Sequence, residues 1–463
     1  MGNDQLEPVI FVIFGITGNL AQQRLLPALY HLLKDDLLPK QMEIVGVSRR
    51  RISVKQLLKN VELCVLETDH ICDPEVLKAF QHKLKMLQLD PVKETDYDKL
   101  RKYLQTIEDT HGRCMNWLFY LSIPPHVYEP VIRNLGRCHL NQGCRHHRGV
   151  TRLLVEKPFG YDLVSAQDLI QSTNRYFSED QIFRIDHYLA KETVQNILVF
   201  RSENPIFNSL WDHHFIRSIN IDLYETIGIN GRVDFYENVG ALRDVVQNHL
   251  LQLMALITME IPKNIRDNQS LHQAKQVLFD QVKAVDLKKA GMVRAQYKGY
   301  RVEVNNRRST TETYVSLKLY IDNQRWHGVP IRITTGKALN DDRTTIQLIF
   351  ASTGDVATNT LTFRVQPNEG IDIDLVVKRP GFEDKTETVR MDFKYQDTFI
   401  EPGHPDAYER VLVDAVKGDH SLFATSQEVI ATWRILQPIL NAWEKRSDDL
   451  KCYPIGTSGP KPN

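Results

Sequence analysis

Val9-Ile10-Phe11-Val12-Ile13-Phe14 runs directly into Gly15-Ile16-Thr17-Gly18-Asn19-Leu20-Ala21, and this stretch decides the fold. Six consecutive apolar residues predict a short buried strand, and the run up to Leu33 predicts a helix after the loop. Glycines let the backbone turn tightly and approach a ligand, while the helix points its free N–H groups at an anion. We therefore predict a dinucleotide site that uses Gly15, Thr17, Gly18, Asn19 and Leu20. A plain strand-to-helix turn is the alternative.

Three consecutive arginines follow the second predicted strand. This strand covers residues 43–48, and Arg49, Arg50 and Arg51 come directly after it. An acidic residue in this place favours NAD, whereas an arginine binds the 2′-phosphate of NADP through two hydrogen bonds. We therefore predict NADP as the cofactor, held by Arg49, with NAD as a weaker alternative. Arg50 and Arg51 fit a solvated turn.

Two patterns of secondary structure divide the chain. Short apolar strands alternate with amphipathic stretches in the first half, which is typical of βαβ units and a parallel sheet. Beyond about residue 200, period-two strands predict a large antiparallel sheet with flanking helices. The predicted fold class is α/β plus α+β: a Rossmann-like NADP-binding domain over residues 1–185, then a β+α substrate and dimerisation domain over residues 186–463. The predicted strands cover residues 9–14, 43–48, 117–123, 152–155, 313–322, 330–335, 344–352, 359–366 and 370–377, and the predicted helices cover residues 57–66, 75–87, 242–259, 406–416 and 427–443.

The composition is that of an ordinary globular protein without a charge bias. Of 463 residues, 58 are Lys or Arg and 58 are Asp or Glu, so the formal net charge is zero. This balance argues against binding to nucleic acid or to an anionic membrane surface. Six cysteines are too few for a disulfide framework, and the first residues do not form a signal segment, so we expect reduced thiols and a cytoplasmic location. The tail over residues 453–463 is rich in Gly and Pro and is expected to be loose.

The densest chemistry lies in residues 184–192, which read Arg-Ile-Asp-His-Tyr-Leu-Ala-Lys-Glu. If this segment is helical, His187 and Lys191 share a face with Tyr188 beside them, and together with Lys157 they can hold a phosphate dianion. His249 lies in a predicted apolar helix and suits a general base if a carboxylate orients it. Taken singly, each residue is more often a surface residue or a core histidine than a ligand.

Together these segments resemble the glucose-6-phosphate dehydrogenases, and the resemblance covers nearly the whole chain. It is carried, in order, by residues 15–21, 116–121 with Pro124-Pro125, 156–160, 184–192, 247–249, 336–340, 365–369 and 406–410. The family has an N-terminal dinucleotide-binding domain and a β+α domain whose antiparallel sheet builds a dimer interface. The resemblance therefore implies a homodimer or a dimer of dimers.

Matching positions imply a role for each candidate residue. His249 is the implied general base that takes the proton from the C1 hydroxyl of β-D-glucose 6-phosphate, and Asp186 orients it. Hydride then passes from C1 to the nicotinamide without a metal, giving 6-phosphogluconolactone in the first step of the oxidative pentose phosphate pathway. The implied substrate contacts are Lys157, His187, Tyr188, Lys191, Glu225, Asp244 and Lys337, and the implied cofactor contacts include Thr17, Arg49, Tyr128 and Lys157. The family also implies a cis peptide bond between Lys157 and Pro158.

The chain departs from the family pattern in several places. Asn19 stands where the family has an aspartate, and Ala190 replaces the usual glycine of the nonamer. Asp372 and Asp374 occupy the segment that supplies Tyr and Lys to a second, structural NADP in some members. We therefore do not expect that second site.

Two further interpretations concern metal binding and alternative functions. Two thiols and three imidazoles lie between Cys138 and His147, but their spacing matches no zinc motif, so a polar loop is preferred and no metal is expected. A Gfo/Idh-like dehydrogenase of unphosphorylated sugars stays open, although it would not need the cluster of His187, Tyr188 and Lys191. A catalytically silent NADP-binding protein stays open as well.

Overall fold

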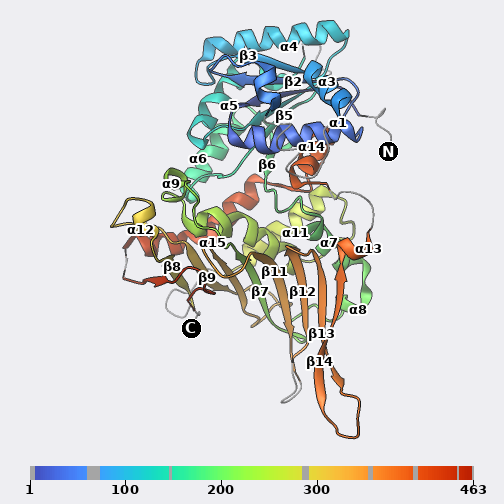
Figure 1. Ribbon diagram of the computed structural model, residues 1–463, viewed down its shortest axis with the longest axis vertical. Helices are drawn as coiled ribbons and strands as arrows, with labels where there is room; N and C mark the ends of the chain where they lie inside the picture. Colours follow the sequence, from blue (N-terminus) through green and yellow to red (C-terminus); the bar gives the residue numbers. More distant parts are fainter. Residues whose placement is uncertain are drawn as a thin grey trace. The chain divides into compact units, whose positions relative to one another are not determined.

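The computed structural model describes residues 6–59, 73–144, 149–283, 291–352, 358–399, 405–445 and 448–460 (Figure 1). The chain forms two compact units. The first unit contains residues 1–160, 164–190 and 405–426, and the second contains residues 161–163, 191–404 and 427–463. Residues 405–426, which come late in the chain, thus belong to the first unit.

The first unit is built on a seven-stranded sheet with the order β15-β6-β5-β4-β1-β2-β3. All neighbouring strands in it are parallel except β15, which pairs antiparallel with β6. Its strands are β1 (Val9–Phe14), β2 (Met42–Ser48), β3 (Leu84–Gln88), β4 (Asn116–Leu121), β5 (Thr151–Val155), β6 (Ile182–Ile185) and β15 (Phe423–Ala424). Its helical segments are the π-helical η2 (Ala21–Leu25), then α1 (Leu26–Lys34), α3 (Pro74–Lys83), α4 (Tyr97–His111), α5 (Tyr128–Arg137), α6 (Leu163–Asn174) and α14 (Ala407–Lys417). This is the parallel α/β architecture that the sequence predicts.

The core of the first unit is the centre of this sheet. Every residue of β1 and β4 is buried, as expected for strands that are covered on both faces. Helix α14 packs beside α1, although the two are far apart in the sequence (Figure 1). The four strands predicted in this half are confirmed as β1, β2, β4 and β5, to within two residues at their ends.

One predicted helix of the first half ends too late, and another lies mostly outside the described residues. The helix predicted over residues 75–87 is wrong at its end, because α3 stops at Lys83 and Leu84–Gln88 form β3. These five residues pair with β2, and the sheet hydrogen bonds outweigh the helical pattern of the sequence. Of the helix predicted over residues 57–66, only residues up to 59 are described, and they are helical.

The second unit contains a nine-stranded sheet with the order β14-β13-β12-β11-β7-β10-β9-β8-β16. Its strands are β7 (Ile216–Tyr224), β8 (Val293–Tyr297), β9 (Tyr314–Leu319), β10 (Ile331–Gly336), β11 (Arg343–Phe350), β12 (Thr360–Gln366), β13 (Gly370–Lys378), β14 (Thr386–Lys394) and β16 (Leu450–Tyr453). Its helical segments are α7 (Glu192–Glu203), α8 (Pro205–Asn208), α9 (Val233–Tyr236), the π-helical η7 (Leu242–Leu250), α10 (Leu251–Thr258), α11 (Asn268–Gln281), α12 (Tyr300–Glu303), α13 (Tyr395–Thr398) and α15 (Ser426–Lys445). The predicted β+α class is confirmed.

This sheet is mixed, not wholly antiparallel. Strands β7 and β10 run parallel, as do β8 and β16, while the other neighbours are antiparallel. The five strands predicted here are confirmed as β9 to β13, and alternate residues of β11 and β12 are buried. The parallel pair matters for the site, because the carboxyl ends of β7 and β10 meet at the same edge of the sheet.

The described part of the carboxyl-terminal tail, residues 453–460, is packed, which corrects the expectation of a loose segment there. The Tyr453 hydroxyl donates a hydrogen bond to the Lys337 carbonyl at 2.6 Å, and the Gly456 amide donates to the Ala338 carbonyl at 2.9 Å. The Tyr314 hydroxyl donates to the Pro460 carbonyl at 3.1 Å. Glycine and proline end regular structure, but these contacts hold the tail against the loop after β10.

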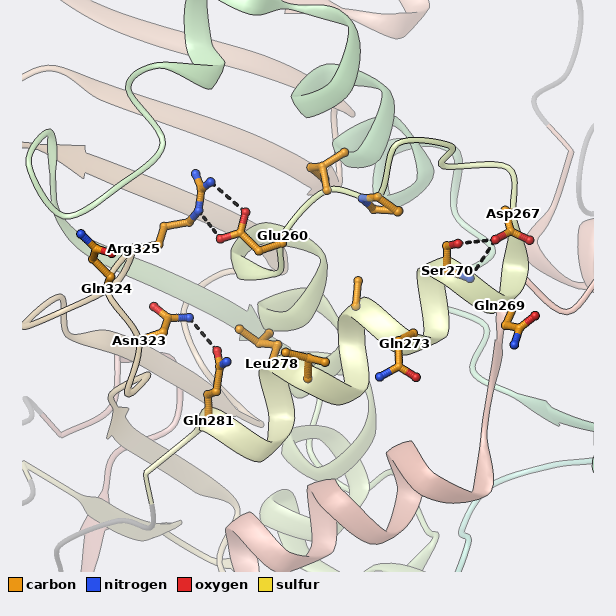
Figure 2. A pocket seen from close by; sticks show the side chains of 14 residues that line it. Glu260, Asp267, Gln269, Ser270, Gln273, Leu278, Gln281, Asn323, Gln324 and Arg325 are labelled. Carbon is orange, nitrogen blue, oxygen red and sulfur yellow. Dashed lines mark hydrogen bonds and ion pairs between the residues drawn. The ribbon is translucent and has the colours of Figure 1, made fainter.

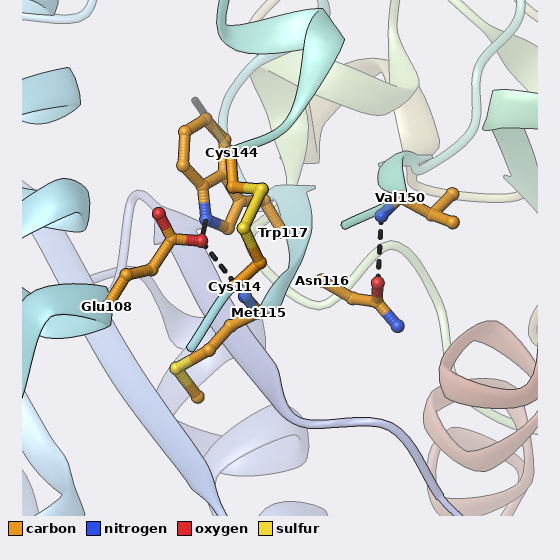
Figure 3. The surroundings of a disulfide bond; sticks show 7 residues. All are labelled: Glu108, Cys114, Met115, Asn116, Trp117, Cys144 and Val150. Atoms are coloured by element: carbon orange, nitrogen blue, oxygen red, sulfur yellow. Dashed lines mark hydrogen bonds between the residues drawn. A yellow bond between two sulfur atoms is a disulfide. The ribbon is translucent and has the colours of Figure 1, made fainter. Parts of the chain in front are cut away.

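The structure also corrects the expectation that all thiols are reduced, because Cys114 and Cys144 form a disulfide with a Cα–Cα distance of 5.7 Å. These residues lie just before β4 and before β5, which are neighbouring parallel strands, so the entries to both strands meet at one edge of the sheet. Beside the disulfide, Glu108 accepts hydrogen bonds from the Met115 amide at 2.9 Å and from the Trp117 indole at 3.2 Å (Figure 3). The bond also uses one thiol of the cluster between Cys138 and His147, of which residues 145–148 lie outside the described residues.

In the part of the chain that the structure describes, no helix combines the length and the apolar character needed to cross a lipid bilayer.

Candidate active site

A cavity of about 550 Å³ opens at the carboxyl ends of β1, β2 and β4. Gly15, Thr17, Gly18 and Arg49, all predicted cofactor residues, line it together. Gly15 has a φ of +76°, and a β-carbon at this position would lie 2.1 Å from the Ser122 carbonyl oxygen. Only glycine therefore fits, and the open backbone forms the cradle that a dinucleotide phosphate requires.

The rim of this cavity is cationic at the end of β2. Arg49 and Arg50 are both exposed and both line the cavity. The Arg50 amide donates to the Ser48 hydroxyl at 3.1 Å, and the Gln88 side chain donates to the Arg49 carbonyl at 3.1 Å. The backbone of the turn is thus held while the guanidinium groups face solvent. The site suits a 2′-phosphate, and Arg50 is a candidate that the sequence argument had assigned to a solvated turn.

Four of the predicted cofactor residues are not among those that line this cavity: Asn19, Leu20, Tyr128 and Lys157. Tyr128 is buried, and its hydroxyl donates to the Glu156 carbonyl at 3.1 Å. This contact supports the segment that carries Lys157. The peptide bond between Lys157 and Pro158 is cis, as the family resemblance implies.

Glu156 is a buried acid that the sequence argument missed. The Tyr120 hydroxyl donates to its carboxyl oxygen at 2.5 Å. Burial raises the pKa of Glu156 to about 7 and the charge of Asp186 adds to the rise, whereas Tyr120 and Lys157 oppose it. Tyr120 lies on β4 and Glu156 directly follows the neighbouring strand β5, so only the pairing of these strands brings the two groups together. The result is an acid beside Lys157 that changes charge near neutral pH.

The nonamer is not a helix, so the shared helical face predicted for His187 and Lys191 is wrong. Strand β6 ends at Ile185, residues 187–190 form a turn, and α7 begins only at Glu192. The Asp186 carboxylate accepts a hydrogen bond from the Tyr188 amide at 3.0 Å. Such a local side-chain contact competes with helix formation and stabilises a turn.

Around this turn, aromatic and imidazole groups cluster within the first unit. The His187 ring lies 5.1 Å from the Tyr188 ring and 6.2 Å from the Tyr408 ring, measured between centroids. Tyr408 lies in the first turn of α14, and Asp406 caps this helix by accepting a hydrogen bond from the Tyr408 amide at 2.8 Å. The returning segment therefore adds a phenol next to His187. Tyr408 lies in a motif shared with the family, but its contact with His187 depends on the fold.

In the second unit, Glu225 and Lys337 meet at the carboxyl ends of β7 and β10. The Lys337 ammonium lies 2.5 Å from a Glu225 carboxylate oxygen, and its side chain is almost wholly buried. The same ammonium lies 5.4 Å from the centroid of the Tyr236 ring. The parallel pairing of the two strands places these predicted substrate contacts together. A carboxylate and an ammonium in this arrangement can bind hydroxyl groups or a phosphate.

Tyr236 belongs to the same cluster and was missed. Its hydroxyl is buried and finds no hydrogen-bond partner within the described part of the chain. Burial raises the pKa of this phenol well above its usual value, and the charges of Asp244, Glu312 and Glu225 raise it further. The phenol therefore stays protonated and keeps a donor available close to two predicted substrate contacts.

His249 and Asp244 lie on η7, a π-helical stretch, and both are buried. π-helical turns are rare and occur frequently at functional sites. The buried Glu312 accepts a hydrogen bond from the Leu242 amide at 2.9 Å, which satisfies a free N–H group at the start of η7. Gln247 donates to the Thr432 hydroxyl of α15 at 3.0 Å. The segment that carries the predicted base is thus held at its start and along its length.

Lys191 occupies the N-cap position of α7. Its ammonium donates a hydrogen bond to the Gln366 side chain, and the Thr193 hydroxyl donates to the Val365 carbonyl at 3.3 Å. Gln366 precedes a cis peptide bond to Pro367. The ammonium is therefore positioned by the end of β12.

A parallel sheet with a glycine cradle and an arginine rim, joined to a sheet domain that carries a buried histidine, defines a nicotinamide-dependent oxidoreductase. The family models "Glucose-6-phosphate dehydrogenase, NAD binding domain" and "Glucose-6-phosphate dehydrogenase, C-terminal domain" match residues 12–196 and 198–463. The chain therefore belongs to the glucose-6-phosphate dehydrogenase family.

Individual relatives agree with this placement. The glucose-6-phosphate 1-dehydrogenase of Chlamydia muridarum is 36% identical, and the match covers 98% of this chain and 94% of that protein. A solved glucose-6-phosphate dehydrogenase in complex with glucose-6-phosphate has a TM-score of 0.92 at 31% identity, covering 100% of this chain and 97% of that one. The glucose-6-phosphate 1-dehydrogenase of Mycobacterium avium has a TM-score of 0.85 at 33% identity, covering 98% and 96%.

Proposed function

We propose that this chain oxidises D-glucose 6-phosphate at C1 to 6-phospho-D-glucono-1,5-lactone and passes the hydride to NADP+. This reaction is the first step of the oxidative pentose phosphate pathway. The observation that carries the proposal is the family match over nearly the whole chain, together with the turn at Gly15, where only glycine fits. No observation favours a dehydrogenase of unphosphorylated sugars or a silent NADP-binding protein.

The residues of the first unit bind the cofactor and part of the substrate. The glycine cradle holds the pyrophosphate, and Arg49, with Arg50 beside it, holds the 2′-phosphate and so selects NADP over NAD. NADP+, when bound, accepts the hydride that leaves C1 of the sugar. We assign His187 and Tyr188 to the substrate phosphate, and Lys157 to both ligands. The Tyr128 hydroxyl supports the backbone next to Lys157 through its hydrogen bond to the Glu156 carbonyl.

The residues of the second unit bind the sugar and move the proton. His249 takes the proton from the C1 hydroxyl as hydride departs, so the sugar loses one proton and one hydride and a C=O double bond forms at C1. We assign Asp186 to the orientation of this imidazole and to the stabilisation of its cation. Lys191 binds the phosphate, and Glu225, Asp244 and Lys337 contact the sugar or its phosphate.

We also propose an oligomeric state and a role for each part of the chain. Residues 1–185 supply the cofactor contacts, and residues 186–463 supply most substrate contacts and the dimer interface, although residues 405–426 pack in the first unit. The protein is a homodimer or a dimer of dimers that uses the nine-stranded sheet. The edge strand β14 supports this, because nearly all of its residues are exposed, including the apolar Val389 and Met391. A shift from dimer to monomer mass in Met391→Lys, measured by light scattering, is the expected result.

We propose a cytoplasmic location, because charged sugar phosphates and NADP do not cross membranes unaided. The cytoplasm keeps most thiols reduced, whereas the structure pairs Cys114 and Cys144 as a disulfide, so the fraction of this pair present as dithiol or as disulfide in the cell tests the proposed location. Alkylation of thiols in intact cells, followed by mass spectrometry, measures the two states. A fully oxidised pair in the cell would contradict this location.

The activity is tested by the absorbance of reduced nicotinamide with purified protein. Glucose 6-phosphate and glucose are compared, each with NADP+ and with NAD+. Fast turnover of the phosphate ester alone, with NADP+ preferred, is the expected result. Equal turnover of glucose would favour the dehydrogenase of unphosphorylated sugars, and binding of NADP+ without turnover would favour the silent binding protein.

A further inference from the structure

Three histidines gather at the amino ends of β7 and β10, at the opposite end of these strands from Glu225 and Lys337. His213 and His214 lie in the turn before β7, and His327 lies in the turn before β10. All three line one cavity of about 510 Å³, together with Asp322, Asn323 and Gln324. Neither the nicotinamide chemistry nor the sugar site uses this group.

Three donor atoms in the turn before β7 are already close together. One ligand atom each from Asp212, His213 and His214 lies within 4.8 Å of the other two. The His214 Nδ1 atom is 3.2 Å from the Asp212 carboxylate. Two donors bonded at about 2.0 Å to a tetrahedral zinc ion lie roughly 3.3 Å apart. The observed separation therefore matches two ligands on one ion.

His213 adds a donor that the protein itself does not use. Its Nδ1 atom is buried and has no hydrogen-bond partner among the described residues. The His213 ring lies 3.9 Å from the His214 ring and 6.5 Å from the His327 ring, between centroids. Burying a polar atom without a partner costs free energy, and a metal ion would use its lone pair.

The two turns that carry the histidines are fixed to each other. The His213 amide donates to the Arg325 carbonyl at 2.8 Å, and the Arg325 guanidinium donates to the Trp211 carbonyl at 2.9 Å. Arg325 also forms two hydrogen bonds with Glu260, at 2.6 and 2.8 Å (Figure 2). The ligands therefore come from a preorganised frame, and little ordering is needed on binding.

We propose that Asp212, His213 and His214 bind one divalent transition-metal ion, best matched by Zn²⁺, with the His327 ring of the neighbouring turn beside the site. Imidazole nitrogens with one carboxylate suit zinc and its neighbours better than Mg²⁺ or Ca²⁺, which prefer sets of oxygen ligands. The nine residues of β7 separate this site from Glu225 by about 27 Å. The ion therefore binds in the turn before β7 and takes no part in hydride transfer.

The test measures binding of Zn²⁺ alone by isothermal titration calorimetry, using protein without an affinity tag and with its thiols alkylated. The wild type is compared with the double variant His213→Gln/His214→Gln and with His327→Gln. The matched control is His111→Gln, because His111 forms a single contact of the same kind, 3.2 Å from a Glu43 oxygen. Co²⁺ is added in a parallel experiment, since its visible spectrum reports the geometry of nitrogen and oxygen ligands.

The expected result is one Zn²⁺ bound by the wild type and by His111→Gln, and loss of that ion in the double variant. His327→Gln should weaken binding about tenfold or more, as loss of an outer-shell partner does. Turnover of the sugar should stay unchanged in His214→Gln, whose side chain is exposed. An ion that stays in the double variant lies elsewhere and overturns the assignment. If the double variant fails to fold, unchanged affinity in His214→Gln overturns it as well.

Discussion

Reduction of the Cys114–Cys144 disulfide should destabilise the first unit by an amount that the length of the closed loop sets. The two cysteines are 30 residues apart. Opening a loop of that length gives the unfolded chain enough entropy to lower the free energy of unfolding by about 3.6 kcal/mol. Cys144 is buried, so reduction, which keeps both sulfur atoms in place, is a cleaner change than substitution.

Hydrogen exchange followed by mass spectrometry is the appropriate assay, because peptides that span β4 and β5 report on the first unit alone. A loss of about 3.6 kcal/mol corresponds to a roughly 400-fold faster exchange of the slowest amides. The wild type is measured with and without reductant, and Cys138→Ala is the matched control because Cys138 is a free thiol. In Cys114→Ala/Cys144→Ala the reductant should have no effect. Equal exchange in oxidised and reduced wild type would refute the reasoning.

Three further predictions concern the cofactor, the base and a buried ion pair. His249→Asn should lower kcat about 10²- to 10⁴-fold while glucose 6-phosphate still binds, and near-normal turnover would remove His249 from its role. Arg49→Ala should weaken NADP+ binding about 10- to 100-fold and leave NAD+ binding almost unchanged. The control is Arg51→Ala, because Arg51 is also exposed. Equal losses of affinity for NADP+ and NAD+ would contradict the part of Arg49 in cofactor selectivity. Burial acts to raise the pKa of Glu428, but Lys275 and a neighbouring histidine outweigh it and lower the pKa to about 2. The ionised Glu428 therefore stabilises the folded protein fully above the usual pKa of 4.5, and this stabilisation is lost as the pH falls toward 2. Urea unfolding should therefore show a difference in the free energy of unfolding between wild type and Glu428→Gln that narrows below the usual pKa of 4.5. A difference that stays constant over this range would argue against the shifted pKa.

Features that depend on neighbouring residues were predictable from the sequence. The apolar run Val9–Phe14 forms β1 with the predicted bounds, and the turn after it has the tight glycine geometry that was expected. Arg49 lines the same cavity as this turn, because strands that are adjacent in a parallel sheet end at the same edge. Local pattern and the rules of parallel sheets are sufficient for this half of the site.

Features that depend on distant partners were not predictable in the same way. The Glu156 carboxyl meets the Tyr120 hydroxyl only because β4 and β5 pair in the sheet. The segment after β6 forms a turn because the Asp186 carboxylate accepts the Tyr188 amide, a contact that the spacing of charged residues does not reveal. Similarly, β3 reads as the continuation of a helix until its pairing with β2 is known.

The return of residues 405–426 to the first unit limits how this protein can be divided. These residues supply β15, the edge strand beside β6, and the Ala415 carbonyl that accepts a hydrogen bond from Arg152 at 2.8 Å. They also supply Ser426, whose hydroxyl contacts the buried Arg184 at 2.7 Å. A fragment that stops near residue 190 would leave both guanidinium groups without these partners. The cofactor-binding unit is therefore contiguous in space but interrupted in the gene, and an autonomous version would need residues 405–426 reattached through a linker or a circular permutation.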